Sequence, residues 1–277
     1  AEDGIRDIHS WLEFRRVLFR SKKAFSDNWI DVYPKKNKRD GGYCTCAYLA
    51  HPYVVINYEG KLDDVSTLIH ELGHAMHYYY AQNYNTYEDY NYSIFVAEVA
   101  SQVNEIILTN YMLNHTDNIE EKKYILDSIL QRFKATMIRQ TMFAHFEDNL
   151  HNKEMKGTVL TKELVQKEYL DLNKLYFGPN VEVDEDIKYE CYRIPHFYYN
   201  FYVYQYATGY AAALKIANDI INKKDGALEN YIKFLKLGST LDPVKSLKVA
   251  GVDIESPSLY DEVFEFFDEK RKELESL

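Results

Sequence analysis

The sequence predicts a mainly α-helical fold with one small β element near its N-terminal end. Apolar residues in the stretch 119–151 recur close to the helical period, as they do in most later segments. Residues 52–58 are instead β-branched and aromatic, which is typical of a strand. Only 11 Gly and 6 Pro occur in 277 residues, too few for a loop-rich or fibrous chain. We therefore expect helices to form nearly all of the fold.

The expected elements follow in order along the chain. After the strand and a Glu59-Gly60 turn, Asp63 and Asp64 offer N-cap oxygens to a helix over about 65–81. The polar residues 83–92 predict a loop, and residues 184–194 a charged linker. Pro195 precedes a long aromatic and Ala-rich helix that ends at about 223–226. The other helices are expected at 94–112, 119–151, 161–175, 227–237, 242–250 and 258–275.

Charge and composition exclude several classes of protein. The 43 acidic and 33 basic residues give a formal net charge of −10, which argues against a nucleic-acid partner. No run of 18 apolar residues occurs, so no membrane association is expected. The three cysteines cannot build a disulfide framework and suit a reducing compartment, so we expect a cytoplasmic protein. The sequence makes no prediction of oligomeric state.

Residues 1–21 differ in character from the rest of the chain. They resemble translated sequencing-adapter sequence found at the ends of metagenomic gene fragments, so we expect them to be non-native. A genuine amphipathic N-terminal helix is the alternative. The remaining residues, 22–277, are expected to form one functional domain.

The first chemical signal is the HExxH motif formed by residues 70–74. On a helix, His70 and His74 lie on one face, so both imidazoles can bind one metal ion about 2.0–2.1 Å away. Glu71 lies one residue along and can accept a proton from a water activated by the metal. The motif thus predicts zinc-dependent hydrolysis, with Glu71 as the base.

A catalytic zinc needs a third protein ligand and an open fourth position. The metzincin pattern HExxHxxGxxH does not fit, because His77 stands three residues after His74, where that pattern requires Gly. Glu88 and Asp89 lie in the polar loop. Glu98 instead lies in a largely apolar helical segment, with 23 residues between it and His74. A buried lone carboxylate is costly without a cation. We therefore predict Glu98 as the third ligand, with Glu105, seven residues later, orienting one of the ligands.

Three separated motifs together resemble one known family. HELGHAMH, FVAEVASQVNE and IPHFYYNFYVYQYATG occur in the order found in the oligoendopeptidase F and thimet oligopeptidase family of zinc metallopeptidases. The resemblance covers about residues 25–277. It implies a multi-helical, zincin-like (gluzincin) catalytic domain, with Zn²⁺ held by His70, His74 and Glu98. It also implies Glu71 as the catalytic base.

The resemblance extends to the Tyr-rich segment. Peptide hydrolysis needs hydrogen-bond donors aimed at the developing oxyanion. The family uses a His and Tyr residues from this region, which implies a catalytic role for His196. Which tyrosines take part stays open, because the spacing differs from that of the thimet branch. We favour Tyr199 and Tyr206, with Tyr202 behind them.

These observations predict the catalytic C-terminal part of a zinc-dependent endopeptidase that hydrolyses short oligopeptides. Family members are about twice as long, so we expect an N-terminal part to be missing and the uncovered wall to expose apolar surface. Residues 53–57 are expected to form an edge strand along which a peptide binds. The alternatives are a catalytically impaired fragment, a non-enzymatic metal-binding scaffold, and a related helical zinc carboxypeptidase using Arg193 for the terminal carboxylate.

Overall fold

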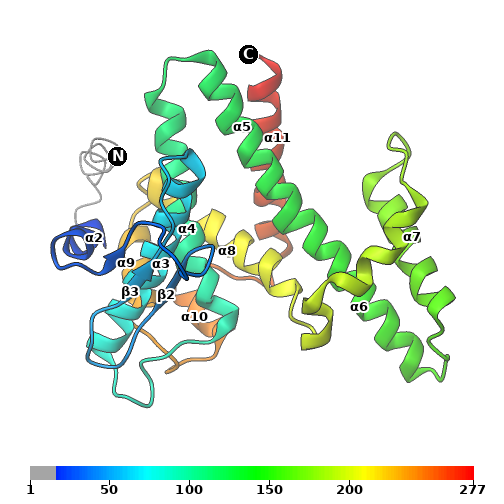
Figure 1. Cartoon of the computed structure of the whole chain (residues 1–277), viewed down its shortest axis with the longest axis horizontal. Coiled ribbons are helices and arrows are strands. Elements are labelled where there is room, and N and C mark those ends of the chain that lie inside the picture. Colours follow the sequence, from blue (N-terminus) through cyan, green and yellow to red (C-terminus); the bar gives the residue numbers. More distant parts are fainter. Residues whose placement is uncertain (1–16) are drawn as a thin grey trace. The chain divides into compact units, whose positions relative to one another are not determined.

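The computed structural model describes residues 17–277 and confirms a mainly helical chain with one small sheet (Figure 1). It divides into two compact units, one comprising the described residues up to Leu126 together with Ala211–Leu277, the other Asp127–Tyr210. The prediction for residues 1–21 lies largely outside the described residues. Residues 17–21 belong to α2 (Val17–Ser26).

The small sheet of the first unit has the strand order β1-β3-β2. Strand β3 (Tyr53–Val55) pairs in parallel with β1 (Ile30–Asp31) and antiparallel with β2 (Tyr43–Thr45). The expectation that residues 53–57 form an edge strand is therefore wrong. The two-residue strand β1 lies in a stretch of mixed sequence that carries no strand signal, and its pairing moves β3 to the centre. Strands β1 and β2 occupy the two edges instead.

Helix α3 (Leu62–Tyr84) begins earlier than predicted. Its N-cap is Lys61, so the prediction that Asp63 and Asp64 cap the helix is wrong. The carboxylate of Asp64 lies inside the first turn and reaches back to accept the backbone N–H groups of Glu59 and Lys61, both at 2.9 Å. This contact satisfies donors just ahead of the helix and places negative charge at the positive end of its dipole.

Helix α4 (Ile94–His115) follows a loop that is fastened to the C-terminal part of the first unit. The carbonyl oxygen of Asp89 accepts the N–H of Ser239 at 2.9 Å. Gly238, between α9 (Ala227–Leu235) and α10 (Pro243–Val249), has φ +55°, and a Cβ atom there would lie 1.9 Å from the Asp89 oxygen. Only glycine permits this approach, which fixes the entry to α4. Helix α11 (Pro257–Glu275) completes the unit.

The helix expected over 119–151 contains a π-helical turn. Helix α5 (Ile119–Phe133) passes through the π-helical residues Lys134–Ile138 into α6 (Arg139–Met155). Helix α7 (Lys162–Phe177) agrees with the prediction. The expected linker 184–194 is instead a 3-10 helix over Glu185–Arg193.

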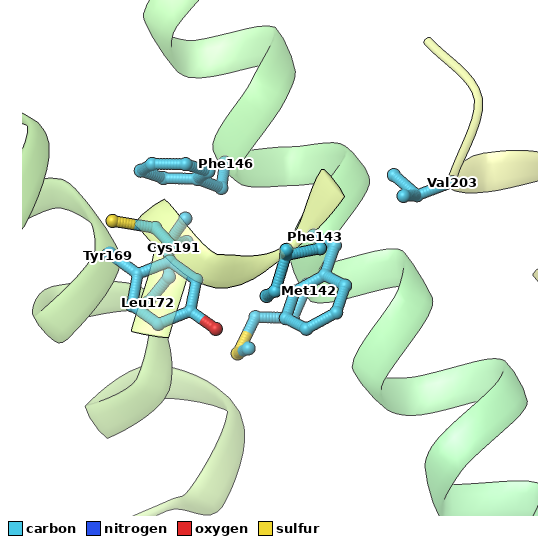
Figure 2. Packing of buried hydrophobic residues seen from close by; sticks show 8 residues of the cluster. Met142, Phe143, Phe146, Tyr169, Leu172, Cys191 and Val203 are labelled. Atoms are coloured by element: carbon cyan, nitrogen blue, oxygen red, sulfur yellow. The ribbon is translucent and has the colours of Figure 1, made fainter. Parts of the chain in front are cut away.

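The second unit has its own hydrophobic core, which Figure 2 shows at close range. Rings of Phe143 and Phe146 on α6 lie against Tyr169 of α7, with the Phe146 and Tyr169 centroids 5.1 Å apart. The Tyr169 hydroxyl donates to the buried Glu190 at 2.7 Å, and Arg139 contacts the same carboxylate at 2.6 Å. The other buried members of the core are Met142, Leu172, Cys191, Ile194 and Val203.

The long helix expected after Pro195 is broken, which corrects the prediction. A short 3-10 helix, Pro195–Tyr199, is separated from α8 (Tyr204–Ile221) by residues 200–203, of which Asn200 and Phe201 come first. These two residues have φ +41° and +51°, in the left-handed region that ends right-handed helical hydrogen bonding. The aromatic pattern continues across the break, so periodicity alone could not reveal it. Within residues 17–277, no helix is both long and apolar enough to span a membrane.

His77 lies on the buried side of α3 and is a packing residue. Its ring stacks on Tyr92 with centroids 3.6 Å apart and also lies against Phe234. Within the described part of the chain, its Nδ1 atom has no hydrogen-bond partner. Complete burial lowers the pKa of His77 to about 3. The imidazole is therefore neutral in the folded protein throughout the neutral and mildly acidic range.

His77 should make stability depend on pH. Because its folded pKa lies below the unfolded value of about 6.5, the stabilisation is complete above pH 6.5 and is lost as pH falls toward 3. Between pH 7 and 5 we expect this residue to cost about 2 kcal/mol. Urea unfolding of the metal-free protein and its His77→Phe variant at both pH values measures the difference. An equal pH dependence in the two proteins would contradict the prediction.

Candidate active site

Three side chains from two helices of the first unit converge on one point. His70 and His74 lie one turn apart on α3, and Glu98 lies in the second turn of α4. The two Nε2 atoms are 3.2 Å apart. Glu98 Oε2 lies 3.2 Å from His70 Nε2 and 3.5 Å from His74 Nε2. The structure thus brings together all three predicted ligands, with the donor atoms within 4.8 Å of one another.

The donor atoms fit a divalent zinc ion. Ligands about 2.1 Å from an ion at tetrahedral angles lie about 3.4 Å from one another, close to the three separations above. The chemistry of the set agrees, since two imidazoles and one carboxylate are the donors of many catalytic zinc sites. Two neutral imidazoles with facing lone pairs repel each other unless a proton or a cation lies between them. The three residues can therefore hold the metal and leave a fourth position open.

Two further side chains of α4 contact the predicted ligands. Glu105 is only 8% exposed, and its Oε1 lies 3.1 Å from His70 Nδ1, where it can accept that N–H and direct the Nε2 lone pair toward the cluster. Ser101, fully buried, donates to Glu98 Oε2 at 3.0 Å. The sequence analysis missed Ser101. The sequence signal that could have identified Ser101 is its spacing of three residues from Glu98, which places both side chains on one helix face.

Contacts with the two histidines also affect the charge of Glu98. Burial by itself raises the pKa of its carboxyl, but contacts with His70 and His74 outweigh this and hold the pKa well below its usual range. The carboxylate is thus negative at neutral pH, as a metal ligand must be.

Glu71 occupies a different environment beside the same helix face. It is 6% exposed, and burial raises the pKa of its carboxyl, against the opposing effect of His70 and His74. Gly42, just before β2, approaches it closely, since a Cβ atom on Gly42 would lie 3.2 Å from Glu71 Oε1 and 2.7 Å from Thr67 Cγ2. A glycine here lets the backbone that leads into β2 approach the side chain of Glu71.

The glycine inside the HExxH motif is required by packing. A Cβ atom on Gly73 would lie 2.5 Å from Ser101 Cα and 2.6 Å from the carbonyl oxygen of Ala100. These are backbone atoms, which cannot turn aside as a flexible side chain could. Helix α4 therefore contacts α3 directly at the point where one helix carries the two histidines and the other carries Glu98.

The remaining predicted residues lie in the second unit and form a cluster of their own. His196 stacks with Tyr202 at 5.5 Å between centroids, and its Nε2 lies 3.5 Å from the Tyr206 hydroxyl. Tyr199 lies farther from the imidazole, at 6.4 Å, and is 65% exposed. The loop acids are placed otherwise: Glu88 is exposed, and Asp89 Oδ1 accepts the Ser239 hydroxyl at 3.2 Å.

The close contact at Gly73 predicts a specific effect on metal binding. Gly73→Ala should force α4 away from α3 and move Glu98, so we expect zinc affinity to fall at least about tenfold, in line with the loss of an orienting group. Asn83→Ala, at the exposed end of α3, is the control. Competition with a chromogenic chelator measures the affinity. Unchanged affinity with raised thermal stability, as expected from helix propensity alone, would contradict the packing argument.

Comparisons with known proteins all point to the same family. The profile of peptidase family M3 matches residues 5–266. Oligopeptidase PepF of Bacillus subtilis is 46% identical over 265 residues, 96% of this chain and 39% of its own length. Plasmid-encoded oligoendopeptidase F of Lactococcus lactis subsp. cremoris is 38% identical over 278 residues, covering all of this chain and 46% of that protein.

Solved structures agree with these matches. A putative peptidase from Chlamydophila abortus superposes with a TM-score of 0.87 at 40% identity, over 94% of this chain and 44% of the other. Oligoendopeptidase F from Enterococcus faecium gives a TM-score of 0.71 at 43% identity, over 78% of this chain and 39% of the other. The chain thus spans less than half the length of these relatives. It belongs to peptidase family M3, in the group of the oligoendopeptidases F.

Proposed function

We propose that this chain is the catalytic region of a zinc-dependent endopeptidase that hydrolyses short oligopeptides. The observation that carries the proposal is the convergence of His70, His74 and Glu98 within 4.8 Å, with the buried Glu71 on the same helix. Membership of family M3 supports peptide hydrolysis, and the names of the relatives indicate oligopeptide substrates.

The roles of the residues follow from their positions. Zinc held by His70, His74 and Glu98 would supply Lewis acidity, lowering the pKa of a water and polarising the scissile carbonyl. Glu71 takes the proton from the attacking water and passes it to the leaving amine. Glu105 holds the His70 ring in the tautomer that can bind metal.

His196, Tyr199 and Tyr206 are proposed to act on the oxyanion. An imidazole N–H or a phenolic hydroxyl can donate to the developing negative charge, where one donor is worth about 10²–10³ in rate. The support is the family resemblance together with the grouping of these side chains around His196. Of the two tyrosines, Tyr206 has the stronger support, because its hydroxyl lies 3.5 Å from the imidazole.

A peptide would bind along β2. Among the described strands, β2 is the one at the sheet edge next to Gly42 and Glu71, so its outer backbone groups can pair with an extended substrate. This replaces the role expected for residues 53–57. We also infer a cytoplasmic location, which rests on three cysteines that the structure leaves unpaired.

The alternatives have less support. A carboxypeptidase would need a cation for the substrate's terminal carboxylate, and the candidate Arg193 is engaged by Glu190 at 2.5 Å. A scaffold that merely binds metal would not need a buried carboxylate in the position of Glu71. Peptides with blocked ends distinguish an endopeptidase from a carboxypeptidase. The Glu71 variant distinguishes an enzyme from a metal-binding scaffold.

The main test uses the whole chain and its Glu71→Gln variant. We expect about one zinc per chain in both proteins, measured by mass spectrometry. Cleavage of a quenched fluorescent peptide of about eight residues with both termini blocked should be lost in the variant, because Gln cannot accept the proton. Glu88→Gln, an exposed loop acid, is the control and should cleave normally.

Three results would contradict the proposal. A folded chain that binds no zinc would exclude the metallopeptidase interpretation. Zinc binding without cleavage by the parent chain would show that the chain is a metal-binding region insufficient for hydrolysis. Cleavage only of peptides with a free C-terminus would favour the carboxypeptidase.

A separate test concerns the oxyanion donors. His196→Ala and Tyr206→Phe should each lower kcat by about 10²–10³, the usual effect of losing one such donor, with little change in KM. Zinc content should stay the same. His145→Ala, which alters another histidine of the second unit, is the control. A variant that raises KM and leaves kcat unchanged would instead indicate a role in substrate binding.

A further inference from the structure

The break between the short 3-10 helix and α8 is a strained turn. Asn200 and Phe201 both have positive φ, +41° and +51°, and neither is glycine. A positive φ is less unfavourable for Asn than for a bulky residue such as Phe. Two such residues in succession persist only when surrounding contacts hold them, and strain of this kind concentrates at functional sites.

A buried carboxylate holds this turn. Glu147 on α6 is 4% exposed, and its Oε1 accepts the backbone N–H of Phe201 at 2.5 Å. Burying a carboxylate is costly unless it is hydrogen-bonded, and a charged acceptor in a dry site makes a strong bond. If the turn changed its conformation, the Phe201 N–H would point away from Glu147 and the buried carboxylate would lose this hydrogen bond.

Helix α6 contacts the turn a second time. His151, one helical turn after Glu147 and on the same face, places its ring 4.6 Å from that of Phe201. On either side, the chain is anchored in the core of the second unit, by Phe197 against Phe143 and Phe146 and by the buried Val203. The conformation of the two residues between these anchors is thus set from α6.

The turn makes the contacts of His196 with Tyr202 and Tyr206 possible. In one continuous helix, His196 and Tyr206 would be separated by about 15 Å along the axis, at 1.5 Å per residue. In the structure the Tyr206 hydroxyl lies 3.5 Å from His196 Nε2, and Tyr202 stacks on the same ring. The change of direction at Asn200 and Phe201 brings the chain back and makes these contacts possible.

We propose that Glu147 is a positioning residue: by holding the left-handed turn at Asn200 and Phe201, it keeps the imidazole of His196 against Tyr202 and Tyr206. The catalytic part of this inference rests on the proposed function of His196. The structural part stands on the geometry of the second unit alone.

The structural part is tested by hydrogen exchange and by NMR of histidine side chains, on the whole chain. Glu147→Ala should speed exchange of the Phe201 amide at least tenfold and shift the resonances of His196. Glu147→Gln keeps an acceptor oxygen and should change both far less. Glu168→Gln is the matched control, since Glu168 is a largely buried carboxylate of α7 whose partners are Lys153 and Asn149 rather than the turn. It should leave both readouts as in the parent.

The catalytic part is tested by a double-mutant cycle. Glu147→Ala should lower kcat on the blocked peptide by up to about 10²-fold, the effect of displacing a catalytic group by about 1 Å, while zinc content and KM stay nearly unchanged. In a His196→Ala background the same substitution should have no further effect, because the loss is transmitted through His196. Equal losses in both backgrounds would overturn the positioning role.

The two parts fail in different ways. If His196→Ala leaves hydrolysis unchanged, the proposed role of His196 is wrong, while exchange at Phe201 still decides whether Glu147 holds the turn. If Glu147→Ala is folded and leaves both the Phe201 amide and the His196 resonances unaltered, the inference about Glu147 is overturned. If that variant does not fold, Glu147→Gln decides. A small loss of Phe201 protection with a matching small shift of the His196 resonances supports the inference, whereas parent-like values of both, or reduced kcat with full protection of Phe201, oppose it.

Discussion

Direct contact between the backbones of α3 and α4 is the constraint on which the metal site depends. The two histidines come from one helix and the third ligand from the other, so the distance between the helix axes sets whether three donor atoms can meet. Gly73, which lies within the HExxH motif, has no side chain and so allows the two helices to approach this closely. Ser101, whose backbone fills the space, also binds the Glu98 carboxylate. Packing and ligand orientation are thus produced by the same pair of residues.

Several carboxylates lie close to this contact between the helices, and their mutual repulsion is unfavourable. Glu71, Glu98 and Glu105 lie within or beside the cluster, in a chain that already carries a net charge of −10. Desolvated acids at short range are unfavourable without positive charge. A bound divalent cation relieves this repulsion, so metal binding and folding of the α3–α4 pair should stabilise each other. The site is built to be most stable when it is occupied.

The parts of the fold that were predictable are those in which local sequence and tertiary contacts agree. The HExxH helix and the capped helix α7 are amphipathic and the Glu98 helix is largely apolar, and the bounds of all three lie within three residues of expectation. The grouping of His70, His74 and Glu98 could be predicted, because a carboxylate on an apolar helix is costly unless positive charge lies close to it, and two helical histidines offer a shared cation site. The position of β3 could not be predicted, because β1 is two residues long and is defined by its partner. The turn at Asn200 and Phe201 was equally hidden, since it is imposed by the distant Glu147 and contradicts the local preference of Phe.

The π-helical turn Lys134–Ile138 has a consequence for how this unit can vary. Buried residues of α-helices recur every three or four positions, yet here Met137 and Met142 are both buried and are five apart. A wider turn absorbs the extra residue and keeps the apolar stripe of α6 in phase with that of the preceding segment. Removing one residue from this turn would rotate every later side chain of α6 by about 100° relative to what precedes it. Natural variants of this helix should therefore gain or lose residues in its end loops, while the length of the stretch between Phe133 and Glu147 stays invariant.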